Sequence, residues 1–223
     1  KPGGVAGLAP LPSDVWGGLP LTLFLAVIAC LAGVPLGILL ALGRRSSLPL
    51  IRILCTGFIE AVRGVPLITL LFFGAFVLPM LVPAQWRVDP MVRIAVCLAA
   101  FSAAYLAEVF RGGLQAVPQG QVMAAQAMGF TRVQVLRHVV LPQALRVTIA
   151  PTVSNFIGAV KDTSLVAIVN IYDITGSLKM AMSDPHWIAY FVEMYMVVCA
   201  VYLLIGLGIA RYGRFLESRY ALQ

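Results

Sequence analysis

Charged residues are scarce in this sequence, and their scarcity excludes a soluble fold. Only 11% of the 223 residues are Asp, Glu, Lys or Arg, while 61% are hydrophobic. Soluble domains carry about 25% charged residues, and no soluble core of this size could bury so much apolar surface, so we expect a lipid bilayer to cover it. The formal net charge of +7 comes without an arginine stripe interleaved with aromatics, which argues against nucleic acid as a partner.

Cysteine pairs, metal-ligand clusters and a nucleotide-binding loop are also missing. The four cysteines stand singly in apolar stretches with no CxxC pair, and we interpret them as small buried hydrophobes. The two histidines, His138 and His186, have no ligand-spaced neighbours, so no metal site is expected. The sequence has no G-x-x-x-x-G-K-[ST] phosphate loop, so we expect a chain that binds no cofactor and is not itself an ATPase.

Long apolar runs dominate what is present. A helix needs about 20 apolar residues to cross the hydrocarbon layer. We therefore expect an all-α transmembrane bundle, a single domain over residues 1–223, with five spans at about 16–42, 48–82, 90–110, 145–171 and 187–210. Five spans place the two termini on opposite sides of the membrane.

Arginine is divided unevenly between the two sides. The predicted loops after spans one and three and the C-terminal tail carry Arg44, Arg45, Arg52, Arg111, Arg132, Arg137, Arg146, Arg211, Arg214 and Arg219. The opposite side carries only Lys1, Arg87, Arg93 and Lys179. Because the side richer in Lys and Arg is cytoplasmic, we predict the N-terminus outside and the C-terminus inside. The tryptophans then fall at outer ends of spans, where interfacial anchors are common: Trp16, Trp86 and Trp187.

One predicted cytoplasmic loop, about residues 119–142, is too polar and too interrupted to cross a bilayer. Two short helical patterns flank Gly129, which allows a tight chain reversal. Thr131 and Gln134 fit a capping box that opens the second helix, and Pro142 is predicted to stop that helix before the fourth span. Periodicity alone leaves two interpretations open: an amphipathic helix lying on the membrane surface, or a segment that contacts a soluble partner.

A specific pattern in this loop favours the second interpretation. The alanine pair Ala124-Ala125 is followed after three residues by Gly129, and then by Val139 and Leu141-Pro142. This spacing resembles the EAA loop of ABC-importer permeases, whose short helix docks in a cleft of the ATPase subunit. The resemblance implies ATPase-coupling roles for Ala124, Ala125, Met128, Gly129 and Phe130. The glutamate of the family pattern would fall at Met123, so any contact that it makes with the ATPase is absent here.

Three further segments resemble permeases that import polar amino acids. They are residues 60–67 (EAVRGVPL), 104–118 (AYLAEVFRGGLQAVP) and 161–165 (KDTSL). Within that family the chain is most similar to permeases of general L-amino-acid importers that pair with a different permease. The resemblance implies the bacterial inner membrane, a second permease, two ATPase subunits that bind ATP and Mg, an extracytoplasmic binding protein, and an L-amino acid as substrate.

Charged and polar groups inside the spans are the candidate substrate contacts, because burying them in lipid costs a few kcal/mol each. Arg63 would clamp the substrate carboxylate with paired hydrogen bonds. Asp162 would bind the substrate ammonium, with Thr163 and Ser164 adding hydrogen bonds, where the fourth span is expected to be interrupted. Glu108 is a further candidate.

The alternative interpretation of these groups is structural. Arg63 would then pair with Glu60, and Glu108 with Arg111, each at a spacing of three residues on one helix. Asp162 would pair across helices. The sequence alone does not decide between these two interpretations.

Two other functions are weighed against an importer. An ion-coupled secondary amino-acid transporter would use Asp162 and Glu108 as proton or sodium sites, but five spans without internal symmetry do not form an inverted repeat. A membrane anchor or assembly subunit would need no substrate path at all.

Overall fold

A computed structural model describes residues 17–83, 85 and 88–220, and within these ranges the regular structure is helical, with no β-strand. The all-α class is therefore confirmed. In chain order the helices are α1 (Gly18–Arg44), α2 (Pro49–Gly64), α3 (Leu67–Phe72), η3 (Phe73–Val77), α4 (Leu78–Leu81), α5 (Pro90–Gln115), α6 (Gln119–Ala127), α7 (Arg132–Val135), η5 (Leu136–Val140), α8 (Leu141–Asp162), η6 (Thr163–Val169), α9 (Ile174–Ala181), α10 (Pro185–Ile188) and α11 (Phe191–Tyr220).

Four helical stretches of the described chain are long and apolar enough to cross a membrane: α1, α5, the continuous run Arg132–Val169, and α11. The second expected span, 48–82, is not one straight helix. It is a pair, Pro49–Gly64 and Leu67–Leu81, bent by 107°. The bend falls at Pro66, because a proline lacks the N–H that would continue the helix and pushes the preceding Val65 into an extended conformation (φ −117°, ψ 148°).

Pro142 does not stop the helix before it, and that prediction is wrong. The helix runs without a break from Arg132 to Val169. A π-helical turn, Leu136–Val140, comes directly before Leu141 and Pro142. Widening the helix by one residue there accommodates the missing N–H and the proline ring. The same arrangement recurs where Phe73–Val77 precedes Leu78 and Pro79.

The centre of the bundle is the contact between α1 and α5. Gly33 and Gly37 lie one turn apart on α1 and face α5. A Cβ atom added at Gly33 would lie 2.7 Å from Ser102 Oγ, and one added at Gly37 would lie 2.9 Å from Leu106 Cβ. Small residues at this spacing let two helix backbones approach closely.

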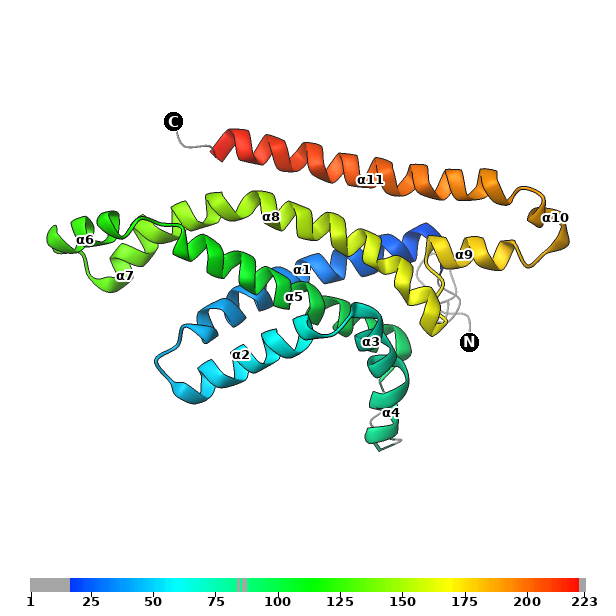
Figure 1. Cartoon of the computed structure of the whole chain (residues 1–223), viewed down its shortest axis with the longest axis horizontal. Coiled ribbons are helices and arrows are strands. Elements are labelled where there is room, and N and C mark those ends of the chain that lie inside the picture. Colours follow the sequence, from blue (N-terminus) through cyan, green and yellow to red (C-terminus); the bar gives the residue numbers. More distant parts are fainter. Residues whose placement is uncertain (1–16, 84, 86–87, 221–223) are drawn as a thin grey trace, which may run out of the picture.

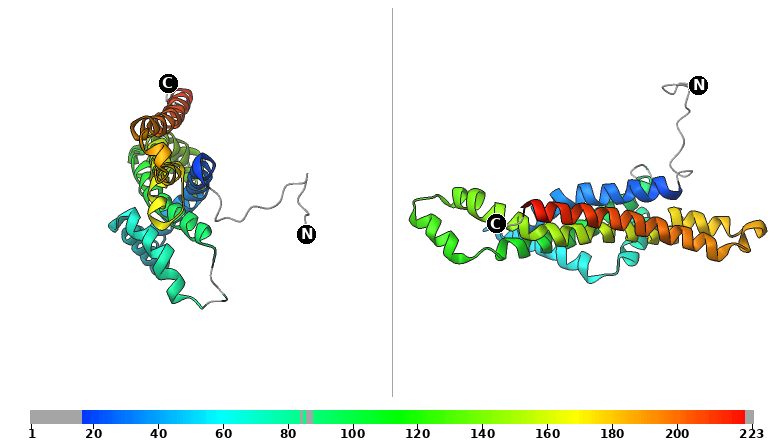
Figure 2. Two further views of the ribbon diagram at one scale, coloured as in Figure 1. Left: turned by 90° about the vertical axis from the view of Figure 1, so that its right-hand side faces the viewer. Right: turned by 90° about the horizontal axis from the view of Figure 1, so that it is seen from above.

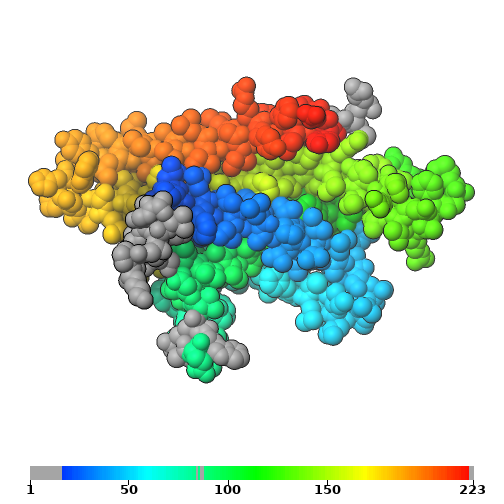
Figure 3. Space-filling model, turned by 180° about the vertical axis from the view of Figure 1, so that it is seen from behind, coloured from blue at the N-terminus to red at the C-terminus, as the bar shows by residue number. Residues whose placement is uncertain are grey.

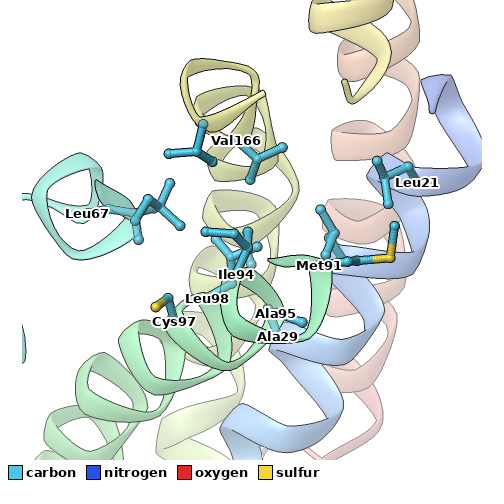
Figure 4. Close-up of a cluster of buried hydrophobic side chains, with 13 residues drawn as sticks. Leu21, Ala29, Leu67, Met91, Ile94, Ala95, Cys97, Leu98 and Val166 are labelled. Carbon is cyan, nitrogen blue, oxygen red and sulfur yellow. The ribbon is translucent and has the colours of Figure 1, made fainter. Parts of the chain in front are cut away.

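A buried apolar cluster extends this contact toward one end of the bundle. Figure 4 shows side chains from α1, α3, α5 and η6 pointing toward one another. The labelled members are Leu21, Ala29, Leu67, Met91, Ile94, Ala95, Cys97, Leu98 and Val166. The cluster holds α3, the second half of the bent pair, against the bundle.

The bundle is elongated, with different elements at its two ends. In Figures 1 and 2 the helices α6 and α7 project at one end of the bundle. The C-terminal ends of α1, α5 and α11 lie at the same end. The helices α9 and α10 lie at the opposite end. The loops predicted to be cytoplasmic thus gather at one end, although the side that faces the cytoplasm stays a prediction. Trp187 lies in α10 at the other end, whereas Lys1, Trp16, Trp86 and Arg87 lie outside the described residues.

Helix α11 forms one long edge of the molecule. Figure 3 shows it, in orange to red, along one edge of the molecule. It packs mainly on α8, where a Cβ atom added at Gly213 would lie 2.6 Å from Val153 Cγ1. Most of its apolar side chains are exposed, so lipid or another protein must cover them in a membrane.

Candidate functional site

The projecting loop is a well-defined helix–glycine–helix unit. The capping box predicted for α7 is confirmed: Thr131 Oγ1 accepts a hydrogen bond from the Gln134 amide at 3.3 Å, and Gln134 Oε1 accepts one from the Thr131 amide at 2.8 Å. Gly129 has φ +85°, a left-handed conformation that favours glycine. The Phe130 amide donates to the Ala125 carbonyl at 3.1 Å, so the turn between α6 and α7 is closed by backbone hydrogen bonds.

The predicted coupling residues do not share one surface. Ala124, Met128, Gly129 and Phe130 are exposed, and Met128 keeps 70% of its accessible surface. Ala125 keeps only 2% and lies inside the loop. The exposed apolar surface of the loop instead includes two residues that the sequence reasoning did not assign to coupling, Met123 and Val133. The sequence did offer a signal for Met123, because this residue occupies the position of the glutamate in the EAA-loop pattern.

Glu108 is the centre of a charge cluster that joins three helices. Its carboxylate accepts hydrogen bonds from Arg111 of the same helix, at 2.9 Å from Nε and 2.6 Å from Nη2. It also accepts one from Arg44 at the end of α1, and Arg63 of α2 lies 3.7 Å away. Three guanidinium groups therefore surround one carboxylate whose side chain is 16% exposed.

The structural pairs proposed from the sequence are formed only in part. The Glu108–Arg111 pair is present. The Arg63–Glu60 pair is not, because Glu60 binds Arg44 at 3.0 Å, while Arg63 stands next to Glu108 and over the ring of Tyr105, 5.4 Å from its centroid. Arg44 of α1 therefore pairs with Glu60, in place of Arg63, which helical spacing had predicted as its partner.

The other predicted substrate residues lie at the transition from α8 to η6. Asp162 and Ser164 are half-buried, and Thr163 is fully buried. The Thr163 hydroxyl donates to the carbonyl of Val160 at 2.7 Å. The expected interruption of the fourth span is a change from α-helix to 3-10 helix at this point, followed by Asn170 in the left-handed conformation.

A buried carboxylate nearby was missed by the sequence reasoning. Asp173 is inaccessible to solvent, and it accepts hydrogen bonds from the Gly176 amide at 2.8 Å and from the Tyr202 hydroxyl at 2.8 Å. It caps the N-terminus of α9 and ties it to α11. Asp is a preferred residue directly before the first residue of a helix, which is a local signal for the cap, but no sequence pattern links Asp173 to Tyr202.

The structure does not bring Arg63 and Asp162 together. Between them, Ser102 of α5 donates a hydrogen bond to Asn155 of α8 at 2.9 Å. The two helices run in opposite directions (Figure 1). Glu108, the neighbour of Arg63, lies six residues beyond Ser102 toward one end, and Asp162 lies seven residues beyond Asn155 toward the other. At about 1.5 Å per residue the two groups are about 20 Å apart along the helix axes, too far to hold one amino acid.

Comparison with known proteins agrees with the arrangement of helices and loop. Residues 33–221 match the family described as binding-protein-dependent transport system inner membrane component. The chain belongs to this family. As a member of a transport family with several spans, it is a multi-pass membrane protein, and the resemblance to ABC-importer permeases is confirmed.

Curated members of this transport family support the same assignment. The chain is 43% identical over 98% of its length to the inner membrane amino-acid ABC transporter permease protein YhdY of Escherichia coli, of which it covers 59%. It is 42% identical over 95% of its length to BztC of Rhodobacter capsulatus, a glutamate/glutamine/aspartate/asparagine transport system permease protein, of which it covers 49%. The chain thus spans about half the length of these two relatives.

A solved structure places the same helices in the same arrangement. An amino acid ABC transporter crystallised with histidines superimposes with a TM-score of 0.81 and 30% sequence identity, covering 91% of this chain and 92% of the solved one. This agreement confirms the expected ABC-importer permease fold.

Proposed function

We propose that this chain is the membrane-spanning permease subunit of an ATP-driven importer for L-amino acids in the bacterial inner membrane. It forms the translocation path with a second, different permease, receives substrate from an extracytoplasmic binding protein, and is driven by two ATPase subunits that bind ATP and Mg. The observation that carries the proposal is the projecting α6–Gly129–α7 loop, on a chain that is 43% identical to an amino-acid ABC transporter permease.

The exposed apolar surface of the loop supports ATPase coupling. Met123, Met128 and Val133 are all largely exposed at the projecting end of the molecule. Large apolar side chains that face water on a projecting loop favour a surface that another protein covers. The hydrogen bonds at Thr131 and Gly129 fix the conformation of the loop. A movement of the loop is therefore transmitted to the continuous helix that follows it.

Two variants test the coupling surface directly. Met128→Asp places a charge on the exposed face, and Gly129→Pro is incompatible with φ +85° because proline holds φ near −65°. Both are expected to abolish ATPase capture and ATP-dependent uptake while leaving membrane insertion intact. Met180→Asp is the matched control, because Met180 is also exposed but lies in α9 at the other end of the molecule. It should capture the ATPase as the unmodified chain does.

The decisive measurement is amino-acid uptake by proteoliposomes that hold the complete complex. Uptake that requires ATP and the ATPase, and that persists when ionophores collapse ion gradients, is the expected result. Uptake that follows an ion gradient without ATP would replace this proposal with a secondary transporter. Normal ATPase capture by both Met128→Asp and Gly129→Pro would remove the loop from the mechanism.

We infer that Asp162 is the stronger of the two charged candidates for substrate contact. Within the described chain Asp162 forms no ion pair, whereas Arg63 already stands beside Glu108. A half-buried carboxylate inside a span without an ion-pair partner is typical of a functional group. Asp162→Asn should therefore lower uptake at equal expression at least tenfold, and Arg63→Lys less. Unchanged uptake in Asp162→Asn would make Asp162 a structural residue only.

A further inference from the structure

A cleft lies where the projecting loop meets the end of α1. Its volume is about 390 Å³, and residues from α1, α5, α6, α7 and η5 line it. Two arginines from distant parts of the chain face the same space: Arg45, which directly follows α1, and Arg132, the first residue of α7. Two amide side chains, Gln119 and Gln126, complete its polar wall.

Within the part of the chain that the structure describes, no ion pair compensates the charges of these two arginines. Neither Arg45 nor Arg132 forms a salt bridge within the described residues, whereas the adjacent Arg44 binds both Glu60 and Glu108. The sequence has no acidic residue between Glu108 and Asp162, and none between Asp14 and Glu60. Both segments that build the cleft therefore lack carboxylates, and two unpaired guanidinium groups in a concave site attract an anion.

The rest of the lining identifies the kind of anion. The floor of the cleft is apolar and includes Leu42, Leu114 and Val140, from the ends of α1 and α5 and the turn before α8. Ends of spanning helices mark the boundary between hydrocarbon and water. The arginine-rich loops at this end of the bundle are those that the positive-inside rule assigns to the cytoplasm, where the membrane leaflet is anionic.

We propose that this cleft binds a phosphate group, and that its source is the head group of an anionic phospholipid of the inner leaflet. The guanidinium groups of Arg45 and Arg132 hold the phosphate oxygens with charge-assisted hydrogen bonds. The glutamine amides donate to the remaining oxygens, and the apolar floor covers the first carbons of the lipid. Bound there, the lipid joins α1 to the coupling loop, so the position of the loop depends on lipid composition.

The test compares lipid retention by two double variants of the complete complex in nanodiscs. The nanodiscs contain phosphatidylcholine with a small fraction of phosphatidylglycerol, and native mass spectrometry counts the phosphatidylglycerol that stays bound. Arg45→Gln/Arg132→Gln removes both arginines of the cleft. Arg52→Gln/Arg137→Gln is the matched control, because it removes two exposed arginines of the neighbouring segments that do not line the cleft.

We expect about thirty-fold weaker phosphatidylglycerol retention in the cleft variant and about fivefold in each single variant, since each cation near an anionic lipid contributes about a factor of five. The control should stay within about twofold of the unmodified complex, because its two arginines do not line the cleft and their attraction for a lipid held there is screened by salt. Equal loss in both double variants, or loss in neither, overturns the proposal. Size-exclusion profiles and the single variants separate a binding defect from misfolding.

A second arm distinguishes the two sources of phosphate. Inorganic phosphate is titrated into complexes held in phosphatidylcholine alone. No saturable binding is expected, because free phosphate makes no contact with the apolar floor. Saturable phosphate binding that disappears in Arg45→Gln/Arg132→Gln, together with unchanged lipid retention, would show that the site takes a soluble anion and would overturn the lipid as its source.

Discussion

At the scale of single residues, Glu108 shows how one carboxylate can organise several helices. Arg44, Arg63 and Arg111 come from three helices and converge on it. Three cations this close together repel one another, so their arrangement depends on the negative charge between them. Glu60 adds a second carboxylate at the edge of the group, and its side chain is 57% exposed. The difference in burial between the two carboxylates predicts different effects of neutralising them.

Glu108→Gln is expected to lower the free energy of unfolding by about 2 kcal/mol. Removing one partner of a buried ion pair costs about 3–5 kcal/mol, and the partial exposure of Glu108 reduces that cost. Glu60→Gln, which removes the same charge from an exposed position, should cost under about 1 kcal/mol. Thermal unfolding of the purified protein in detergent measures both. Equal shifts for the two variants would contradict the central role of Glu108.

At the scale of helices, the contact between α1 and α5 depends on the absence of side chains. Gly33 and Gly37 leave room for Ser102 and Leu106. Gly113 does the same between α5 and α8, where an added Cβ atom would lie 2.8 Å from the carbonyl oxygen of Ala144. Inside a bilayer, helices associate through close packing rather than through the hydrophobic effect. Even one added methyl group should therefore separate them.

Gly37→Ala is expected to destabilise the chain by about 1–3 kcal/mol, because the new methyl group would collide with the backbone and Cβ of α5. Gly208→Ala in α11 is the matched control, since no other atom lies within 4 Å of its added Cβ. It should leave stability unchanged or raise it slightly, because alanine favours helix more than glycine does. Aggregation temperature in detergent compares the two, and a Gly37→Ala protein as stable as the control would disprove the close contact.

At the scale of the whole molecule, the arginine-rich loops and the coupling loop share one end of the bundle (Figure 1). The opposite end is formed by α9 and α10. The positive-inside rule then predicts that the first end faces the cytoplasm. The proposed ATPase docking and the proposed lipid site both require this orientation.

Single cysteines at the two ends test the orientation. Ser47→Cys and Ser183→Cys are matched substitutions at exposed loop positions, introduced after the four native cysteines are replaced by alanine. In spheroplasts a membrane-impermeant maleimide should label Ser183→Cys at once. It should label Ser47→Cys only after permeabilisation. The reverse pattern would place the coupling loop outside and refute the proposed function.

The sequence by itself determined the class of this protein and the location of its loop. Apolar runs of spanning length indicate a membrane bundle regardless of how the helices pack. The capping box at Thr131 and the reversal at Gly129 depend on neighbouring residues only, and both are present. The spacing of the motif residues around Ala124 and Leu141 identified the permease family, because it too depends only on residues close together in the sequence.

Only the tertiary structure decided which distant groups meet. Glu108 and Arg44 are 64 positions apart in the chain, and Arg45 shares a cleft with Arg132. Asp173 reaches Tyr202 on another helix, and the helix continues through Pro142 because a π-helical turn absorbs the proline. Which residues become partners depends on the packing angles and rotations of whole helices. These angles and rotations are determined jointly by side-chain contacts along the entire bundle. Spacing along the chain does not encode them.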